Sequence, residues 1–333
     1  MDNLTHSLVG VALSRVFFKR RVAYATTAMV IAANLPDLDM LYSWPGIRYI
    51  EYHRGVLHSL VMLPIWALLV AWGLRWFCAK RGQAPPAWWL GGLLGATGVG
   101  AHIFLDWTNI YGVRLFAPFS ERWYALDLLP RYDPWIWIIL IAALGFPMLL
   151  TLITSEVRSQ KVRNPHRLSA VIALALVAGW IGLRAKQHAQ ALDLLNDPYF
   201  AGMYDGQLPY DWSALPNRST PWEWQAVVNL PRNYLIADIS SPWNENYGRV
   251  RPLRSYLKPP ATLAGRMAEA TGYGKIMLWY ARYPYTDVQE GANGSRVLIT
   301  DMRYAVGLMR PTMGAVITID GSNQVTGESY HGW

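Results

Sequence analysis

Residues 134–154 read PWIWIILIAALGFPMLLTLIT and carry no charged side chain. A helix of about 20 apolar residues crosses the roughly 30 Å of hydrocarbon in a bilayer, so this stretch predicts a membrane span. Three further segments are interpreted as spans: Leu57–Phe77, Trp88–Leu105 and Leu168–Leu183. Two shorter apolar segments, Leu4–Phe18 and Val22–Leu35, precede them and lie near the lower length limit. The sequence therefore predicts an α-helical polytopic membrane bundle of about six helices, the first two short.

The distribution of cations predicts an orientation for this bundle. The chain has a net charge of +8, and its Lys and Arg residues gather in the loops at 19–21, 75–81 and 158–167. Fewer cations lie in the alternate loops at 36–56 and 107–133. Because cytoplasmic loops are enriched in cations, we expect the first three loops inside the cell and the N-terminus outside. The same clustering beside apolar segments argues against a nucleic acid as a stable partner, and the single Cys78 excludes a disulfide framework.

The residues after about 188 have a different composition, which predicts a second domain over 189–333. Alternating or β-branched segments separated by Pro and Gly clusters predict strands, at Trp222–Leu230, Tyr234–Ile239, Ile276–Arg282, Arg296–Thr300 and Ala315–Asp320. Residues Ala261–Thr271 are interpreted as one helix. We therefore expect a small β-rich extracytoplasmic domain attached to a membrane-embedded helical domain over 1–188.

Histidines and carboxylates recur at the predicted outer ends of the helices. They are His6, Asp37, Asp39, His53, His58, His102 and Asp106. His102 and Asp106 are four residues apart, which places them on one face of a helix. Neutral imidazole and carboxylate are common ligands of zinc, manganese and iron. Ionisable groups at membrane depth are costly unless they pair, line water or bind an ion. The pattern predicts a metal site formed by His6, Asp37, His53, His58, His102 and Asp106.

A divalent ion in such a site would activate water for hydrolysis. Asp37 or Asp39 would then bridge metals or act as general base, and Arg54 and Arg114 would contact a phosphate through their guanidinium groups. Asn109 and Tyr111 are candidate substrate contacts. We expect a membrane-bound phosphoesterase that acts on a lipid-linked or other membrane-associated substrate, with zinc as its ion and manganese or iron as alternatives.

Each of these residues also has a purely structural interpretation. His6 could cap a helix, Asp37 and Asp39 could stabilise a turn, and Arg54 and Arg114 could neutralise nearby carboxylates. Two other function classes stay open on the sequence. One is an ion-coupled transporter that relays protons through intramembrane carboxylates and histidines. The other is a non-catalytic membrane scaffold with an extracytoplasmic binding domain.

The first 150 residues resemble the YdjM family of inner-membrane metal-dependent hydrolases. The resemblance rests on Thr5-His6, on Asn34-Leu35-Pro36-Asp37-Leu38-Asp39, on His53-Arg54-Gly55 with His58-Ser59, and on residues 106–120, DWTNIYGVRLFAPFS. It implies a multi-pass protein of the cell inner membrane that hydrolyses its substrate with a metal ion. The residues after about 150 lie outside this resemblance.

The order histidine, aspartate, histidine, then His-x-x-x-Asp is also similar to zinc-dependent phospholipase C and the related single-strand nucleases. That resemblance implies a helical enzyme holding a cluster of zinc ions. This chain lacks the further downstream histidines and the glutamate that would complete a three-metal site. One or two ions are therefore expected.

Overall fold

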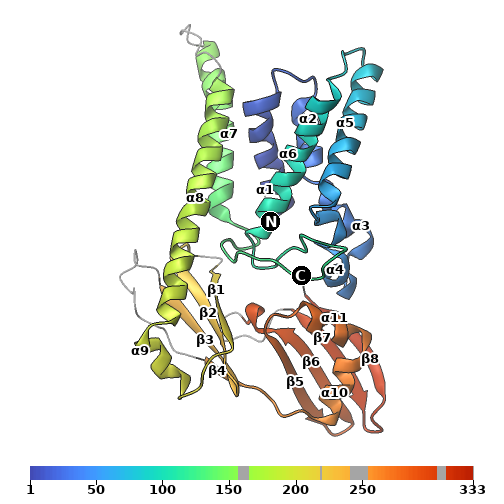
Figure 1. Cartoon of the computed structure of the whole chain (residues 1–333), viewed down its shortest axis with the longest axis vertical. Helices are drawn as coiled ribbons and strands as arrows, with labels where there is room; N and C mark the ends of the chain where they lie inside the picture. The colour runs from blue at the N-terminus through green and yellow to red at the C-terminus, as the bar shows by residue number, and fades with distance from the viewer. Residues whose placement is uncertain (157–164, 218–219, 241–253, 306–312, 333) are drawn as a thin grey trace. The chain divides into compact units, whose positions relative to one another are not determined.

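The computed structural model describes residues 1–156, 165–217, 220–240, 254–305 and 313–332 and divides into two compact units. The first unit comprises Met1–Leu38 and Arg54–Lys186, and the second comprises Asp39–His53 and Gln187–Trp333. In the described part of the chain the first unit is helical, whereas the second contains two sheets (Figure 1).

Six α-helices make up most of the first unit: α1 (Asn3–Leu13), α2 (Ala25–Ala32), α5 (Met62–Lys80), α6 (Trp88–Trp107), α7 (Pro134–Glu156) and α8 (Pro165–Leu195), which continues into the second unit. A π-helical stretch, Ser14–Phe18, extends α1, and short 3₁₀ helices lie at Leu35–Asp39 (η2) and Val56–His58 (η3). The predicted segment Val22–Leu35 is therefore α-helical only over its middle. The predicted span Leu57–Phe77 becomes a helix only from Met62 onward.

Among the described residues, three helices are long and apolar enough to cross a membrane: Met62–Lys80, Trp88–Trp107 and His166–Leu195. A shorter apolar helix covers Pro134–Pro147. Their positions agree with the four spans predicted from the sequence. The polytopic arrangement itself and its orientation stay predictions.

Small residues let α6 approach its neighbours closely. A Cβ atom added at Gly95 would lie 2.9 Å from the Cα of Ala67 on α5, and one added at Gly98 would lie 2.7 Å from the Cβ of Ala32 on α2. Such contacts between small residues are how membrane helices bring their backbones together. In Figure 1, α5 and α6 are neighbours, in agreement with the contacts of Gly91 and Gly95 with α5. This packing holds the ends of α2, α5 and α6 close to one another.

The loop after α6 folds back on residues near the start of α5. Its Leu115 carbonyl accepts a hydrogen bond from the Leu60 amide at 2.9 Å, and its Arg114 amide donates to the Arg54 carbonyl at 3.0 Å. Val113 and Tyr124 pair with each other as an isolated antiparallel bridge. The loop is thereby fixed beside the segment that carries Arg54 and His58.

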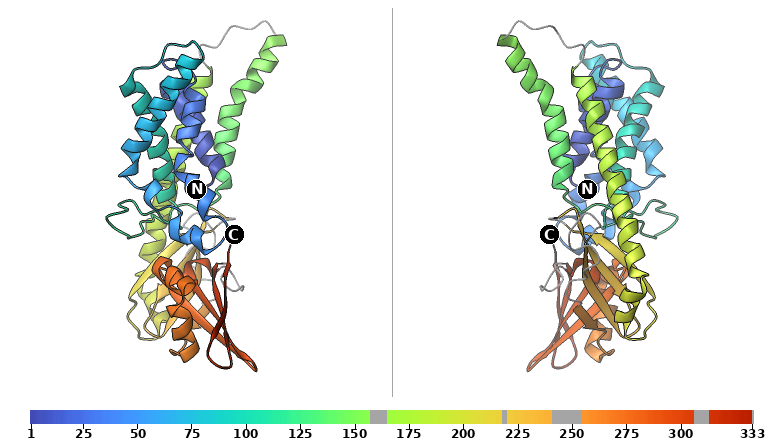
Figure 2. Two further views of the ribbon diagram at one scale, coloured as in Figure 1. Left: turned by 90° about the vertical axis from the view of Figure 1, so that its right-hand side faces the viewer. Right: turned by 90° about the vertical axis from the view of Figure 1, so that its left-hand side faces the viewer.

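The second unit contains two four-stranded antiparallel sheets. One is β1 (Asp211–Pro216), β2 (Glu223–Asn229), β3 (Asn233–Ser240) and β4 (Arg254–Leu257); the other is β5 (Pro284–Gly291), β6 (Gly294–Asp301), β7 (Gly314–Asp320) and β8 (Val325–His331), each in chain order. Helices α10 (Leu263–Ala270) and α11 (Gly272–Tyr280) pack on the second sheet (Figure 2). The short helices α3 (Met40–Ser43), α4 (Ile47–Tyr52) and α9 (Pro198–Ala201), with 3₁₀ turns at Gly202–Tyr204 and Met302–Tyr304, complete the unit.

Most strand predictions are confirmed, because four of the five predicted segments overlap β2, β3, β6 and β7. The helix predicted at Ala261–Thr271 is confirmed as α10. The strand predicted at Ile276–Arg282 is wrong, since Ile276–Tyr280 belongs to α11. The Thr271 side chain accepts a hydrogen bond from the Gly274 amide and so caps this helix, whose Gly274, Met277 and Tyr280 are buried at a spacing of three residues. A cap and a helical burial pattern here outweigh the aromatic, β-prone composition.

Candidate metal centre

Four side chains converge in the first unit from three separate parts of the chain. Asp37 lies in η2, the 3₁₀ helix that follows α2. His58 is the last residue of η3, which precedes α5. His102 and Asp106 occupy successive turns at the end of α6. One ligand atom from each of these four residues lies within 4.8 Å of the others. We call these four residues the His/Asp cluster.

The two carboxylates of the cluster are both shared between the two imidazoles. His58 Nε2 lies 3.2 Å from Asp37 Oδ1 and 3.5 Å from Asp106 Oδ2. His102 Nε2 lies 3.6 Å from Asp37 Oδ1 and 3.4 Å from Asp106 Oδ2. Both Nε2 atoms therefore point toward the same pair of oxygens. This alternation of nitrogen and oxygen donors around one point is the arrangement that a bound cation requires.

His102 is oriented by the backbone of another helix. Its Nδ1 lies 2.7 Å from the Ala33 carbonyl oxygen. A carbonyl oxygen can only accept, so Nδ1 carries the hydrogen and Nε2 presents its lone pair to the cluster. A hydrogen bond from the second ring nitrogen to a carbonyl is the usual support of a metal-binding histidine.

The other carboxylate oxygen of Asp106 lies among cationic and imidazole groups. Arg54 Nη2 is 2.9 Å from Oδ1, and His6 Nε2 is 3.4 Å from the same oxygen. The backbone nitrogen of Met1 also contacts Oδ1. The His6 ring stacks on the His102 ring, with the ring centroids 3.8 Å apart. His6 thus borders the His/Asp cluster through Asp106 and His102.

Asp37 is charged under ordinary conditions. Burial acts to raise the pKa of Asp37, but the neighbouring imidazoles of His102 and His58 in their protonated form, together with the hydrogen bond with His58, outweigh burial, so the pKa lies below its usual value. The amide of Asn3 donates to the second carboxylate oxygen, Oδ2, at 3.0 Å. This bond leaves Oδ1 facing the two imidazoles.

The donor atoms of the cluster fit a divalent cation. Within the described part of the chain, His102 Nε2 and Asp106 Oδ2 are buried and have no hydrogen-bond partner. Buried polar atoms are almost always bonded, so such atoms call for an explanation. Two imidazole nitrogens and two carboxylates suit zinc, manganese or iron. A cation bound among them would satisfy both orphaned atoms.

Two predicted site residues, Asp39 and His53, belong to the second unit. There His53 Nδ1 lies 2.8 Å from Asp39 Oδ1, and both side chains are buried. The His53 ring also stacks on Tyr49 of α4, with centroids 4.4 Å apart. Asp39 therefore holds the orientation of the His53 imidazole.

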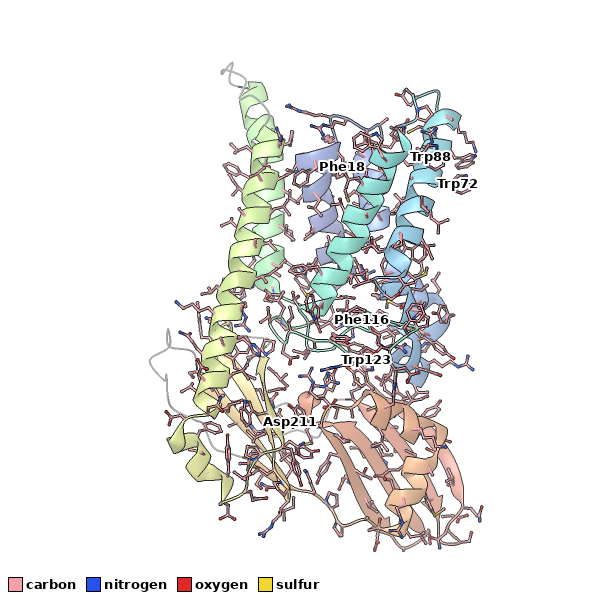
Figure 3. All side chains as sticks on the ribbon, in the orientation of Figure 1. Phe18, Trp72, Trp88, Phe116, Trp123 and Asp211 are labelled. Atoms are coloured by element: carbon pink, nitrogen blue, oxygen red, sulfur yellow. The ribbon has the colours of Figure 1, made fainter. Side chains whose placement is uncertain are left out.

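The remaining predicted residues are Arg54, which precedes η3, and Asn109, Tyr111 and Arg114 in the loop after α6. Tyr111 is buried beneath Arg54, whose guanidinium carbon lies 5.0 Å from the Tyr111 ring centroid. The side chain of Asn109 accepts a hydrogen bond from the Tyr111 amide at 2.8 Å and so supports the turn. The guanidinium carbon of Arg114 lies 5.4 Å from the centroid of Trp123, which is labelled in Figure 3. Of these residues, Arg54 contacts the cluster directly, through Asp106.

Sequence reasoning overlooked the polar residues that support the cluster. One of them is Asn3, described above. Another is Asn34, whose side-chain amide donates to Ser7 Oγ at 3.1 Å and to the Val30 carbonyl oxygen at 2.8 Å. Asp2 caps α1 by accepting from the Thr5 amide, which fixes the helix that carries His6. The signal for Asn34 was present, because it immediately precedes the Leu35-Pro36-Asp37 turn. In the sequence, Asp2 and Asn3 indicated only the start of a helix and no part in a metal site.

Comparison with known proteins relates the helical part of the chain to an established family. Residues 1–191 match the family described as YdjM inner membrane protein. A Bacillus subtilis (strain 168) protein named "Uncharacterized protein YfhP" is 33% identical over 154 residues, which are 44% of this chain. The chain therefore spans about half of the length of that relative, 46% of it. No solved structure matches the chain.

Proposed function

The chain belongs to the YdjM inner membrane protein family, and from this premise we propose that it is a membrane-bound, metal-dependent hydrolase with its active centre at the His/Asp cluster. The observation that carries the proposal is the meeting of Asp37, His58, His102 and Asp106, with two of their atoms buried and without a hydrogen-bond partner. A membrane scaffold would have no need of such an arrangement.

The cluster residues would hold the ion directly. His58 and His102 would donate through Nε2, and the two carboxylates would offset the charge of a divalent cation. The ion would supply an activated water and polarise the bond that the water attacks. The ion is zinc in this proposal, with one or two ions bound.

Arg54 acts in this proposal as a positioning residue. It binds Asp106 Oδ1 at 2.9 Å and lies against Tyr111, so its charge is directed at the carboxylate. This contact fixes which oxygen of Asp106 remains available to the cluster. Arg54 therefore supports a ligand and is not assigned to the substrate.

A phosphoester is the proposed substrate class. Arg114 is half-buried in the loop after α6, and its backbone is bonded to the segment that carries Arg54. A guanidinium group suits bidentate contact with a phosphate, and we assign Arg114 to that contact. A membrane protein with such a site meets lipid headgroups first, so a lipid phosphoester is the proposed substrate.

Metal analysis combined with a hydrolysis assay tests the proposal. Detergent-purified protein should contain near-stoichiometric zinc, manganese or iron and should hydrolyse bis-p-nitrophenyl phosphate. The double variant His102→Ala and Asp106→Ala should lose both metal and activity. His331→Ala removes an exposed imidazole of β8 and should keep both. Protein without metal, or a double variant that remains active, would refute the hydrolase and favour a scaffold.

A further inference from the structure

An apolar groove runs along the first unit between α2 and α5. It encloses about 520 Å³. Its walls consist of uncharged side chains, most of them aliphatic or aromatic; those used below are Tyr24, Leu35, Trp66, Trp72, Gly73 and Phe77. Trp72 is labelled on α5 in Figure 3. The groove is large enough for a flexible hydrocarbon chain.

One end of the groove is connected to the two segments that carry Asp37 and His58. Leu35 lies two residues before Asp37. Trp66 donates from its indole nitrogen to the carbonyl of Leu57 at 3.0 Å, and Leu57 directly precedes His58. Two residues of the groove wall are therefore tied to the two segments that deliver cluster ligands. A chain lying in the groove would have its polar end beside the cluster.

Aromatic side chains line the other end of the groove. The Tyr24 and Phe77 rings meet edge to face with centroids 5.0 Å apart. Beyond them, the Arg81 guanidinium carbon lies 5.3 Å from the Phe77 ring centroid. The wall from Trp66 to Phe77 measures about 16 Å at 1.5 Å per helical residue. That is about half of the roughly 30 Å hydrocarbon thickness, or the depth of one leaflet.

We infer that the α2–α5 groove binds one hydrocarbon chain of a lipid phosphoester, whose headgroup then lies at the His/Asp cluster. This inference rests on the proposed function and names the substrate class of the same centre. Continuity with the cluster, the uncharged lining and the leaflet-long dimension together select a membrane lipid over a water-soluble phosphoester. Binding of the chain would hold the phosphate beside the cluster, because Leu35 and Trp66 of the groove wall are tied to the segments that carry Asp37 and His58.

Gly73 offers a way to fill the groove. A Cβ atom at Gly73 would meet no atom within 4 Å, so a larger side chain can be added without a clash against the helix neighbours. Gly92 on α6 provides a matched control. It is also helical, partly buried and open to an added Cβ, but it does not line the groove.

Photolabelling of the full chain tests the inference. The protein is placed in phosphatidylethanolamine–phosphatidylglycerol vesicles that contain phosphatidic acid with a diazirine on one acyl chain. Labelled peptides should come preferentially from 24–35 and 66–77, several-fold above those around Leu93, which is exposed on α6. Gly73→Trp should reduce this labelling several-fold, whereas Gly92→Trp should not. Diacylglycerol with the same diazirine chain should label the groove several-fold less, because it lacks the phosphate.

The outcomes separate this inference from the proposed function. Equal labelling of the groove and of the Leu93 face, or labelling unaffected by Gly73→Trp, would show only surrounding lipid and overturn the inference. Cross-linking of two copies through the groove would overturn it as well. The metal content of both glycine variants should match the unaltered protein. If metal and hydrolysis are absent but selective, phosphate-dependent labelling persists, the hydrolase fails and the groove stands as a lipid site.

Discussion

His102 donates its Nδ1 hydrogen to the carbonyl oxygen of Ala33, which lies 69 positions earlier in the chain, at 2.7 Å. This bond joins the end of α6 to the end of α2 and points the lone pair of His102 Nε2 at Asp37 and Asp106. The cluster is therefore preorganised by backbone packing before any ion binds, and ligand positions fixed in this way favour metal affinity.

Removal of metal should lower the thermal stability of the purified protein. An ion that binds only the folded state stabilises it by about 2.7 kcal/mol at a hundredfold excess over its Kd. The midpoint of thermal unfolding should fall after chelation and return on adding zinc or manganese. His102→Ala should give a midpoint that does not respond to either treatment. An identical response in that variant would contradict binding at the cluster.

Substitution of Arg54 should disturb the cluster through Asp106. Arg54→Ala removes the guanidinium partner of a buried carboxylate, and breaking a buried ion pair typically costs about 3–5 kcal/mol. Loss of a residue that orients a ligand typically weakens metal binding about 10–100-fold. Metal titration followed by elemental analysis measures this change. Arg122→Ala removes an exposed cation of the loop after α6 and serves as the control.

The close packing of α5 and α6 predicts opposite effects of alanine at two glycines. Gly95→Ala would place a methyl group 2.9 Å from the Cα of Ala67 and should destabilise the protein by about 1–3 kcal/mol, as overpacking does. Gly92→Ala adds a methyl group in open space and should be neutral or slightly stabilising. Thermal unfolding in detergent compares the two variants. Equal midpoints would contradict the packing described for these helices.

The second unit should depend on a buried ion pair that is independent of the metal. Arg303 Nε lies 2.7 Å from Asp301 Oδ2, and the same oxygen accepts from the Arg282 amide at 2.8 Å. Asp301→Ala would leave the Arg303 charge buried and should destabilise the unit by about 3–5 kcal/mol. Limited proteolysis should then cleave within residues 187–333 faster. The metal content should not change, because Asp301 contributes nothing to the His/Asp cluster.

The predicted orientation can be tested by labelling single cysteines. In a Cys78→Ser background, Ser120→Cys should react with an impermeant maleimide in intact cells. Ser159→Cys, which lies outside the described residues, should react only after permeabilisation. The reason is the excess of cations near 158–167, which is typical of cytoplasmic loops. The reverse pattern of reactivity would show that the topology is inverted.

The apolar composition determined the helical part of this protein. Uninterrupted segments such as Trp88–Leu105 can satisfy their backbone groups in lipid only as helices, so their position followed from the sequence. The strands β3 and β7 were also readable, because most of their residues are buried and many of these are β-branched or aromatic. The cap of α11 could not be read from the sequence, because the bond between Thr271 and Gly274 depends on where the helix begins. This segment was therefore predicted as a strand.

The sequence identified the chemical types at the candidate centre, whereas the tertiary structure decided which of them meet. Asp37 and Asp39 are two positions apart and look equivalent in the sequence, yet Asp37 joins the His/Asp cluster while Asp39 binds His53 in the other unit. Likewise, the sequence left open whether Arg54 contacts a phosphate or neutralises a carboxylate, and the structure shows that it binds Asp106. The physical reason is that ligand convergence depends on helix crossing and on long-range contacts such as that of His102 with Ala33. These contacts connect residues far apart in the chain and leave no local pattern in it.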